Sequence, residues 1–446
     1  MNTKFHVFSS STTASHIFSR SRDFVFEPVV ASMMENGVNL PTLDRPKFQL
    51  PLKPHHLLTD SEQRSREFLS ANHTIYLKYL TSVTLDMVMN TYMAKLQHVS
   101  ADLFPKDGSG WVTIDYHELM RKTIFETSVL TFFGTRLHEI WPDMWEDWKL
   151  FNDATFAGVR SNVSWYSRPK ARAARERMLQ AFDEWVDTEI EEWPETQSIW
   201  NDKWGIKMNW EREILGRKFE FTHRGRACLQ ASFLFVIVTN SAPMATWFTI
   251  CIFKSPGGVA RYREEIASSV KCTDGIGQDE FPLDVLKLKQ SQYIQGVWKE
   301  SLRTGSASAA ARVVTKEAEI DGFIVKPGSV LLLPVQLLHF DHDVFPQPQQ
   351  TDPNRWITND AKDEEKYRQI QKQNSHLRSF GGGIGLCSGR FVAEQEIINV
   401  VSTVLFLFDL EFVKPIEGLD LNPQSIGIMN PKRNPTVRLR RRKLKV

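Results

Sequence analysis

Cys387 is the residue best placed to do chemistry in this sequence, because a glycine-rich run precedes it and an amphipathic helical pattern follows it. Glycines let the backbone turn its N–H groups toward one point, and a helix N-terminus adds partial positive charge there. Both effects lower the pKa of a thiol and favour a thiolate. The sequence therefore predicts that Cys387 is either a nucleophile or a metal ligand.

Other interpretations of this segment are weaker. No protease-like cysteine signature surrounds Cys387. A dinucleotide-binding loop would need a third glycine where Ser388 stands. A merely buried cysteine at a helix start would leave the glycine run unexplained.

Glu300 and Arg303 form a second candidate group. Their spacing puts them on one face of a helix, where they can pair. Taken alone, such a pair is usually a solvated surface contact. Further along the chain come a short β-type run from Arg312, a Pro-Gly turn, and Arg355 within Pro-Asn-Arg-Trp. The spacing of the pair alone therefore leaves its role open.

Together these parts resemble the cytochrome P450 family. The haem-binding loop of that family has the pattern Phe-x-x-Gly-x-Arg-x-Cys-x-Gly, and Phe380, Gly383, Cys387 and Gly389 match it. The arginine two residues before the cysteine usually contacts a haem propionate, but this position is Gly385 here. The resemblance implies that the propionate finds another partner, or water.

The resemblance also implies roles for the remaining residues. Cys387 would be the axial thiolate and metal ligand of haem b, pushing electron density toward the iron. Arg312 matches the position that pairs with a haem propionate. Arg355 would join Glu300 and Arg303 in a buried network that fixes the cysteine loop.

The uncharged stretch Ala231–Phe253 is long enough to cross a membrane, but its polar residues favour a helix through a large core. In the family a central helix crosses the oxygen-binding face and carries an acid–alcohol pair. No carboxylate occurs here, and Asn-x-x-Pro-x-x-x-Trp, beginning at Asn240, resembles the prostacyclin synthase and sterol 7α/12α-hydroxylase branch. Asn240 and Thr239 are the candidate catalytic residues. Alternatively they only satisfy the backbone carbonyl freed by Pro243.

The remaining pattern predicts a mainly α protein with small β-sheets, which by resemblance is the cytochrome P450 fold with one haem-thiolate domain over residues 1–446. Helical periodicity covers most of Asp60–Phe253 and Gly257–Arg303, and it returns after Cys387. Strands are expected at the chain start, from Arg312, after Gly322 and over Val330–Pro334. The stretch Val344–His376 is expected to be irregular. The family's N-terminal membrane anchor and first strands are expected to be missing.

Composition excludes several classes of protein. With 41% hydrophobic and 24% charged residues and a net charge of +2, the chain has a globular balance and no excess charge for nucleic acid. Its four cysteines show no zinc-type spacing and no disulfide framework.

By resemblance, the expected function is monooxygenation of a lipophilic small molecule (a terpenoid, sterol or polyketide), within secondary metabolism. O₂ and NADPH-cytochrome P450 reductase would be the partners, at the cytosolic face of the endoplasmic reticulum membrane. The alternatives are isomerase or dehydratase chemistry without O₂, or an inactive haem-binding homologue. Mostly apolar or small residues would line the substrate pocket, from Val30–Lys53, the helix near Asn240, Ser306–Ala311 and Ile426–Met429.

Overall fold

The computed structural model describes residues 3–49, 57–81, 83–106, 110–161, 165–193, 198–270, 283–358, 362–416 and 427–443. Over these residues the chain is mainly helical with small β-sheets, as predicted. Two of the expected pocket segments, Val30–Lys53 and Ile426–Met429, lie partly outside the described residues.

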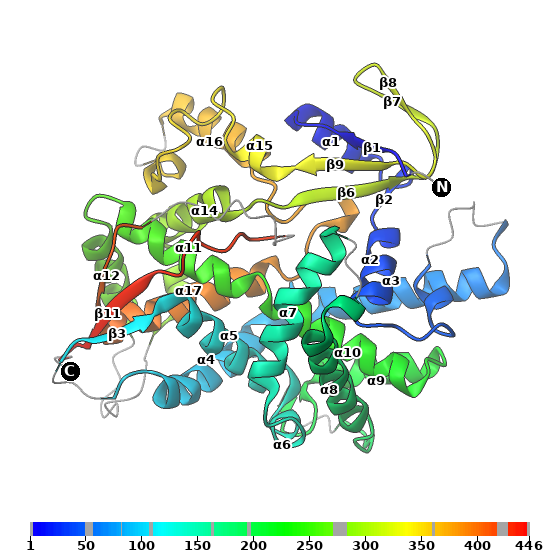
Figure 1. The fold of residues 1–446 in the computed structure, drawn as a ribbon. Coiled ribbons are helices and arrows are strands. Elements are labelled where there is room, and N and C mark those ends of the chain that lie inside the picture. Colours follow the sequence, from blue (N-terminus) through cyan, green and yellow to red (C-terminus); the bar gives the residue numbers. More distant parts are fainter. Residues whose placement is uncertain are drawn as a thin grey trace.

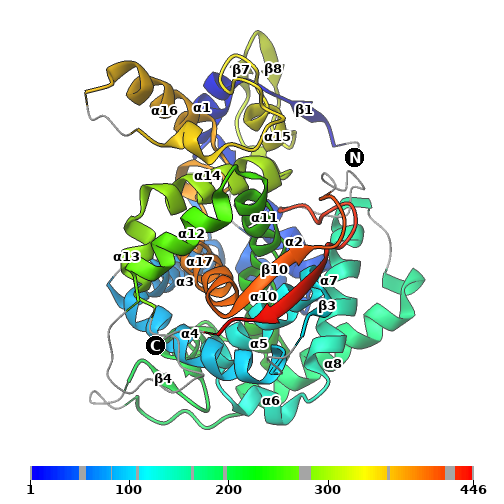
Figure 2. The same ribbon diagram turned by 90° about the vertical axis from the view of Figure 1, so that its left-hand side faces the viewer.

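Helices form the body of the molecule, below the sheet that holds the N-terminal strand (Figure 1). In the turned view, α17 lies in the middle of this helical body (Figure 2), and nearly all of its residues are buried. The α-helices are α1 (Ser11–Ser19), α2 (Glu27–Asn36), α3 (Asp60–Leu80), α4 (Thr84–Leu103), α5 (Tyr116–Phe133), α6 (Arg136–Ile140), α7 (Met144–Ser161), α8 (Pro169–Val186), α9 (Lys207–Lys218), α10 (His223–Val238), α11 (Ser241–Lys254), α12 (Gly258–Ser268), α13 (Val285–Gln290), α14 (Gln292–Gly305), α15 (Val335–His339), α16 (Glu364–His376) and α17 (Arg390–Leu407).

The largest sheet has four strands in the order β1-β9-β6-β2, and its antiparallel centre places Arg312 on β6 opposite Leu331 on β9. Strand β1 pairs with β9 in parallel, with Phe5 opposite Val330. A second sheet has the order β10-β11-β3. The strands are β1 (Phe5–Val7), β2 (Phe24–Val25), β3 (Val112–Asp115), β4 (Trp200–Asn201), β5 (Gly205–Ile206), β6 (Ala309–Val314), β7 (Ala318–Ile320), β8 (Phe323–Val325), β9 (Val330–Pro334), β10 (Phe408–Phe412) and β11 (Thr436–Arg441).

Helices α10 and α11 form one apolar rod with a break after Val238. By length and composition His223–Lys254 could span a membrane, but 83% of its most apolar window is buried inside the protein. Helix α11 packs against α5, α14 and α17. The interpretation of this stretch as a core helix therefore fits its surroundings.

One secondary-structure expectation is wrong. The stretch Val344–His376 is not irregular throughout, because α16 occupies its last part. Asp363 caps this helix by accepting a hydrogen bond from the Lys366 N–H, and Glu364 and Glu365 add negative charge to its first turn. These end signals support the helix although few of its residues are apolar.

Candidate active site

The segment from Phe380 to Cys387 folds into a closed loop in front of α17. The Cys387 N–H donates a hydrogen bond to the Phe380 carbonyl over 3.1 Å, so the ends of the loop are joined. Gly383 has a φ of +64°, which favours glycine, and a Cβ at this position would lie 2.4 Å from the Phe18 carbonyl oxygen. The glycines therefore let the loop fold tightly against the end of α1.

Cys387 precedes α17, whose N-cap is Gly389. The side chain is exposed, but the protein atoms around the sulfur desolvate it and raise the pKa of the thiol. The N–H groups of Gly389 and Arg390, and the Arg390 charge, oppose this rise. The predicted lowering of the thiol pKa is therefore wrong for the protein alone, because burial outweighs the helix N-terminus. A bound metal ion deprotonates a thiol outright, so the metal-ligand interpretation is the stronger one.

Glu300 and Arg303 are both fully buried on α14. They form a bidentate pair with N–O distances of 2.9 and 2.7 Å. Arg355 Nε and the Trp356 indole N–H donate to the same carboxylate, over 3.2 and 2.9 Å. Burial alone would raise the pKa of Glu300, but the hydrogen bonds and charges of Arg303 and Arg355 outweigh it and hold the pKa below its usual value. The three residues thus meet in one buried, ionised network.

This network continues to the cysteine loop through His339. The Nδ1–H of His339 donates to the Arg303 carbonyl over 3.1 Å. Its Nε2 accepts the Arg378 N–H over 3.0 Å, two residues before Phe380. Burial lowers the pKa of His339 to about 3, so the ring is neutral and Nε2 stays an acceptor. Backbone and side-chain hydrogen bonds therefore connect α14 to the start of the loop.

The two candidate catalytic residues, Thr239 and Asn240, both lie in the break between α10 and α11. Pro243 has no N–H to donate to the Thr239 carbonyl. The Thr239 hydroxyl donates to Asn152 Oδ1 on α7 over 2.9 Å. Asn240 Oδ1 instead accepts the Ile428 N–H over 2.9 Å. The two side chains therefore bond different elements, and their catalytic roles stay predictions.

Asn240 holds the C-terminal segment close. A Cβ on Gly427 would lie 2.0 Å from Asn240 Oδ1, so only glycine fits there. The Asn240 side chain is exposed, and its amide nitrogen has no hydrogen-bond partner among the described residues. Its carbonyl oxygen is thus committed to the protein, and its N–H₂ group remains available to a ligand.

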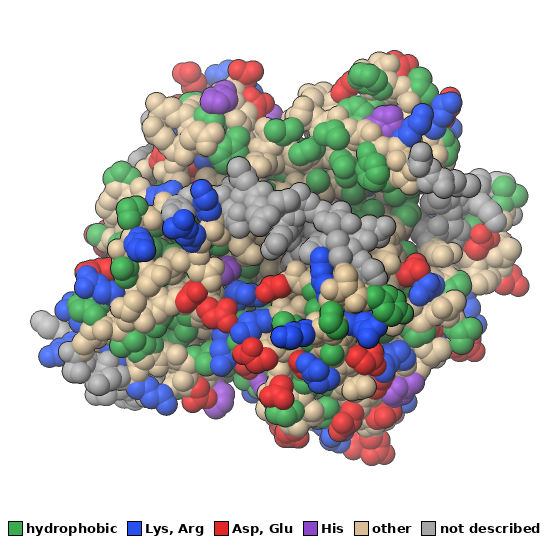
Figure 3. Space-filling view, in the orientation of Figure 1, with side chains coloured by type: hydrophobic (Ala, Val, Ile, Leu, Met, Phe, Trp, Pro, Cys, Tyr) green, Lys and Arg blue, Asp and Glu red, His purple; other side chains and the backbone are tan. Residues whose placement is uncertain are grey.

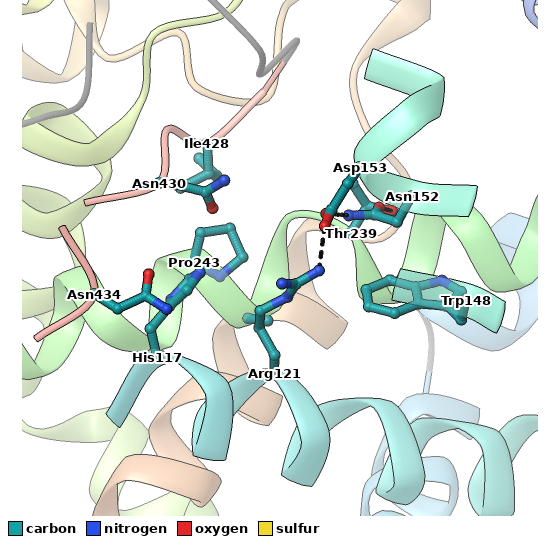
Figure 4. A pocket seen from close by; sticks show the side chains of 11 residues that line it. His117, Arg121, Trp148, Asn152, Asp153, Thr239, Pro243, Ile428, Asn430 and Asn434 are labelled. Carbon is teal, nitrogen blue, oxygen red and sulfur yellow. Dashed lines mark hydrogen bonds and ion pairs between the residues drawn. The ribbon is translucent and has the colours of Figure 1, made fainter. Parts of the chain in front are cut away.

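A polar cavity of about 160 Å³ adjoins the break, beside Thr239 and Pro243 (Figure 4). Arg121 points across it and pairs with Asp153 over 3.0 Å. The Trp148 indole N–H at its wall is buried and has no partner among the described residues. Such a space has room for several water molecules.

A family model described as "Cytochrome P450" matches residues 62–439, most of the chain. The chain belongs to the cytochrome P450 family. The predicted fold class is confirmed by similarity to the structure of retinoic acid-bound cyanobacterial CYP120A1. That match has a TM-score of 0.67 at 15% identity and covers 98% of this chain and 89% of the other.

Among similar P450 proteins, cytochrome P450 monooxygenase calL of Penicillium decumbens is 24% identical over 77% of this chain and 64% of its own length. The 7-alpha-hydroxycholest-4-en-3-one 12-alpha-hydroxylase of Oryctolagus cuniculus is 25% identical over 56% of this chain and 54% of its own length. Cytochrome P450 7A1 of Rattus norvegicus is 23% identical over 80% of this chain and 72% of its own length. The match thus spans less than two thirds of the length of the first two. The predicted resemblance to sterol hydroxylases and fungal P450 proteins is confirmed.

The P450 family implies haem, whose propionates are anions and whose iron takes a cysteine ligand. Arg312 offers a matching cation, because its side chain is only 5% exposed and no carboxylate of the described residues lies within salt-bridge distance. Burial lowers the pKa of Arg312, and the charge of Glu27 opposes this. A buried cation without a bonded counter-charge fits an anionic ligand. The residues present therefore fit haem.

Sequence reasoning missed Glu396, a buried acid within α17. It is 1% exposed, and its Oε1 accepts hydrogen bonds from Ser128 over 2.7 Å and Tyr92 over 3.0 Å. Ser241, the first residue of α11, also bonds it. Burial raises the pKa of Glu396 to about 7, although the three hydroxyls oppose the rise. The available signal was a run of three polar residues, Glu394 to Glu396, inside a mostly apolar helix.

Replacing Glu396 with glutamine should change how stability depends on pH. The folded pKa lies above the unfolded value of 4.5, so the wild-type free energy of unfolding falls as pH rises from about 4.5 to 7 and is then flat. The fall should be about 3 kcal/mol. Urea unfolding should show Glu396→Gln matching the wild type near pH 4.5 and exceeding it at pH 8. Equal pH slopes would contradict the raised pKa, and the exposed Glu319→Gln serves as control.

Proposed function

We propose that this P450 chain is a haem-thiolate monooxygenase that hydroxylates or otherwise oxidises a lipophilic small molecule. Its electrons would come from NADPH-cytochrome P450 reductase and its oxygen atom from O₂. The observation that carries the proposal is the closed glycine loop. It presents Cys387 at an accessible position and is tied to the buried Glu300 network.

When bound, haem supplies the centre at which O₂ is activated. The chain supplies the remaining functions. Cys387 would coordinate the iron, and Arg312 would hold an anionic propionate through its free N–H groups. Glu300 and its arginines keep the loop in place. The free amide N–H₂ of Asn240 would orient the substrate or a water molecule beside the helix break.

The proposed substrate class is a terpenoid, sterol or polyketide. Val236, near the end of α10 and four residues before Asn240, is 55% exposed, so an apolar side chain is available close to the break. Hydrophobic side chains also gather on one face, over β6 and β9 (Figure 3). The names of relatives include a sterol hydroxylase, which fits the same class. A role in secondary metabolism, at the cytosolic face of the endoplasmic reticulum, completes the proposal.

The second candidate function is isomerase or dehydratase chemistry at the same site. The uncharged stretch Ala231–Phe253 favours it, because this helix offers no carboxylate to supply protons for O₂ chemistry. The arrangement at Asn240 also resembles the prostacyclin synthase branch. An inactive haem-binding homologue would keep the loop and lose turnover.

A reconstitution experiment separates these functions. Purified protein would be screened with terpenoids, sterols and polyketides for a shift of the Soret band. Each hit would then be incubated with NADPH, reductase and O₂. Product that requires all three supports the monooxygenase. Product that forms without them contradicts it and supports the isomerase, and binding without product in either mixture supports the inactive homologue.

A further inference from the structure

Trp247 ends the Asn-x-x-Pro-x-x-x-Trp pattern of the central helix, and the proposed function gives it no role. The side chain is 4% exposed, and its indole N–H donates to the Met429 carbonyl over 2.7 Å. At the start of the pattern, the Asn240 Oδ1 accepts the N–H of Ile428 over 2.9 Å. The two ends of the pattern therefore bind neighbouring residues of one segment, which also lines the cavity beside the helix break (Figure 4).

This segment, residues 427–430, is also bonded to the end of α14 and to the residues just before β6. The Met429 N–H donates to the Gly305 carbonyl over 3.1 Å, and the Ala307 N–H donates to the Gly427 carbonyl over 3.2 Å. Gly305 is the last residue of α14. The segment therefore bridges α11 and α14, and its position depends on both helices.

Two glycines make room for the two side chains that bind this segment. A Cβ on Gly305 would lie 2.9 Å from the Trp247 Cγ and Cδ1 and 3.2 Å from its Cβ. These are inner atoms of the side chain, so turning the ring alone would not relieve the contact. A Cβ on Gly427 would lie 2.0 Å from the Asn240 Oδ1. Neither glycine has a positive φ, so close approach, and not backbone conformation, is the reason for glycine at both positions.

The bond to Ile428 fixes the direction of the Asn240 amide. The Oδ1 faces the segment, and the N–H₂ group has no hydrogen-bond partner among the described residues. Met429 is 6% exposed, so without the indole N–H its carbonyl would lose a donor at a place that water reaches poorly. The segment would then shift to find another donor, and the Ile428 N–H would move with it.

We propose that Trp247 is a positioning residue for the candidate active site. It acts through the Met429 carbonyl to hold residues 427–430 against the helix break, and the Ile428 N–H in turn keeps the amide of Asn240 turned toward the ligand. The ligand is the lipophilic small molecule of the proposed function, and the inference rests on that function in this one respect. The hydrogen bonds themselves belong to the chain, so they can be tested without ligand or haem.

The first test measures hydrogen–deuterium exchange of the full chain, resolved to single residues by mass spectrometry with electron-transfer fragmentation. The variants are Trp247→Phe, Asn240→Ala and the double variant, and Trp185→Phe is the matched control. Trp185 is also buried, and its indole N–H donates to the Phe133 carbonyl over 3.3 Å, between α8 and α5. The exchange rate of the Ile428 N–H reports the bond to Asn240 directly.

Trp247→Phe should speed exchange of the Ile428 and Met429 N–H groups about tenfold, the ratio expected for the loss of one buried hydrogen bond. Asn240→Ala should speed exchange at Ile428 at least as much. The double variant should stay within about twofold of the faster single variant, because both bonds hold the same segment. Trp185→Phe should leave these two rates within about twofold of the wild type.

The second test uses the reconstituted enzyme with the substrate that the reconstitution identifies. Trp247→Phe should raise KM about tenfold and keep kcat within about twofold of the wild type, because a loosened amide binds the substrate and the transition state less well to the same extent. Trp185→Phe should leave both constants within about twofold.

Wild-type exchange of the Ile428 N–H in Trp247→Phe would overturn the inference, and so would equal acceleration in Trp185→Phe, which would indicate a general loss of stability. Rates that multiply in the double variant would show that the two bonds act independently and would also overturn it. An unchanged KM in Trp247→Phe would do the same. A wild-type chain without haem or turnover would instead refute the proposed function, and the exchange rates would then decide the positioning role alone.

Discussion

A Cys387→Ser protein is expected to lose the red-shifted Soret band of the reduced carbon monoxide complex, and its reductase-dependent turnover should fall to background. Serine keeps the size of the side chain but supplies no thiolate, and thiolate ligation gives P450 proteins this band and their oxygen chemistry. The loop should still fold, because the bond between residues 387 and 380 uses backbone atoms only. Spectra of the reduced, carbon monoxide-treated protein provide the measurement.

Cys228→Ser is the matched control. Unlike Cys387, Cys228 is buried, and its Sγ contacts the Val38 carbonyl at 3.3 Å in the helical core. This variant should keep the band. If Cys387→Ser retained both the thiolate spectrum and turnover, Cys387 would not be the ligand.

A Glu300→Gln protein is expected to be destabilised by about 3–5 kcal/mol, the usual result of removing one partner from a buried ion pair. Glutamine cannot neutralise Arg303 and Arg355, whose N–H groups now converge on the carboxylate. That loss is a large part of the roughly 5–15 kcal/mol that stabilises a typical domain. Urea unfolding and haem content of the purified protein measure it.

Glu364→Gln provides the comparison at the surface. Glu364 pairs with Arg368 at 3.7 Å, and both side chains are largely exposed. Such pairs contribute little, so this variant should unfold like the wild type. If Glu300→Gln did the same, the network would not stabilise the fold.

The sequence predicted elements best where side-chain period and turn residues agree. Strand β9 has the predicted bounds Val330–Pro334, and the helix after Cys387 is present as α17. Helix α16 was missed because its residues are mostly polar, so it has no apolar stripe. Its local signs were the capping residue Asp363 and the acidic residues of its first turn.

The site was predictable where residues match the family's motifs. The resemblance placed Arg355 with Glu300 and Arg303, and in the structure its Nε reaches the same carboxylate. The bond between Asn240 and Ile428 joins residues far apart in the sequence. No periodic pattern in the sequence predicts this contact or the hydroxyl groups that surround Glu396. The wrong sign for the Cys387 pKa has the same origin, because desolvation depends on neighbours that only the fold supplies.

The bonds from Glu300 through Arg303 and His339 to the Arg378 N–H have a consequence for heat inactivation. The loop that carries Cys387 is anchored in fully buried charges, and these separate only when the interior opens. On heating, the Cys387 sulfur should therefore keep its position until the whole fold unfolds. The protein would unfold in one cooperative step, without an earlier stage in which the fold is intact but Cys387 has left its position.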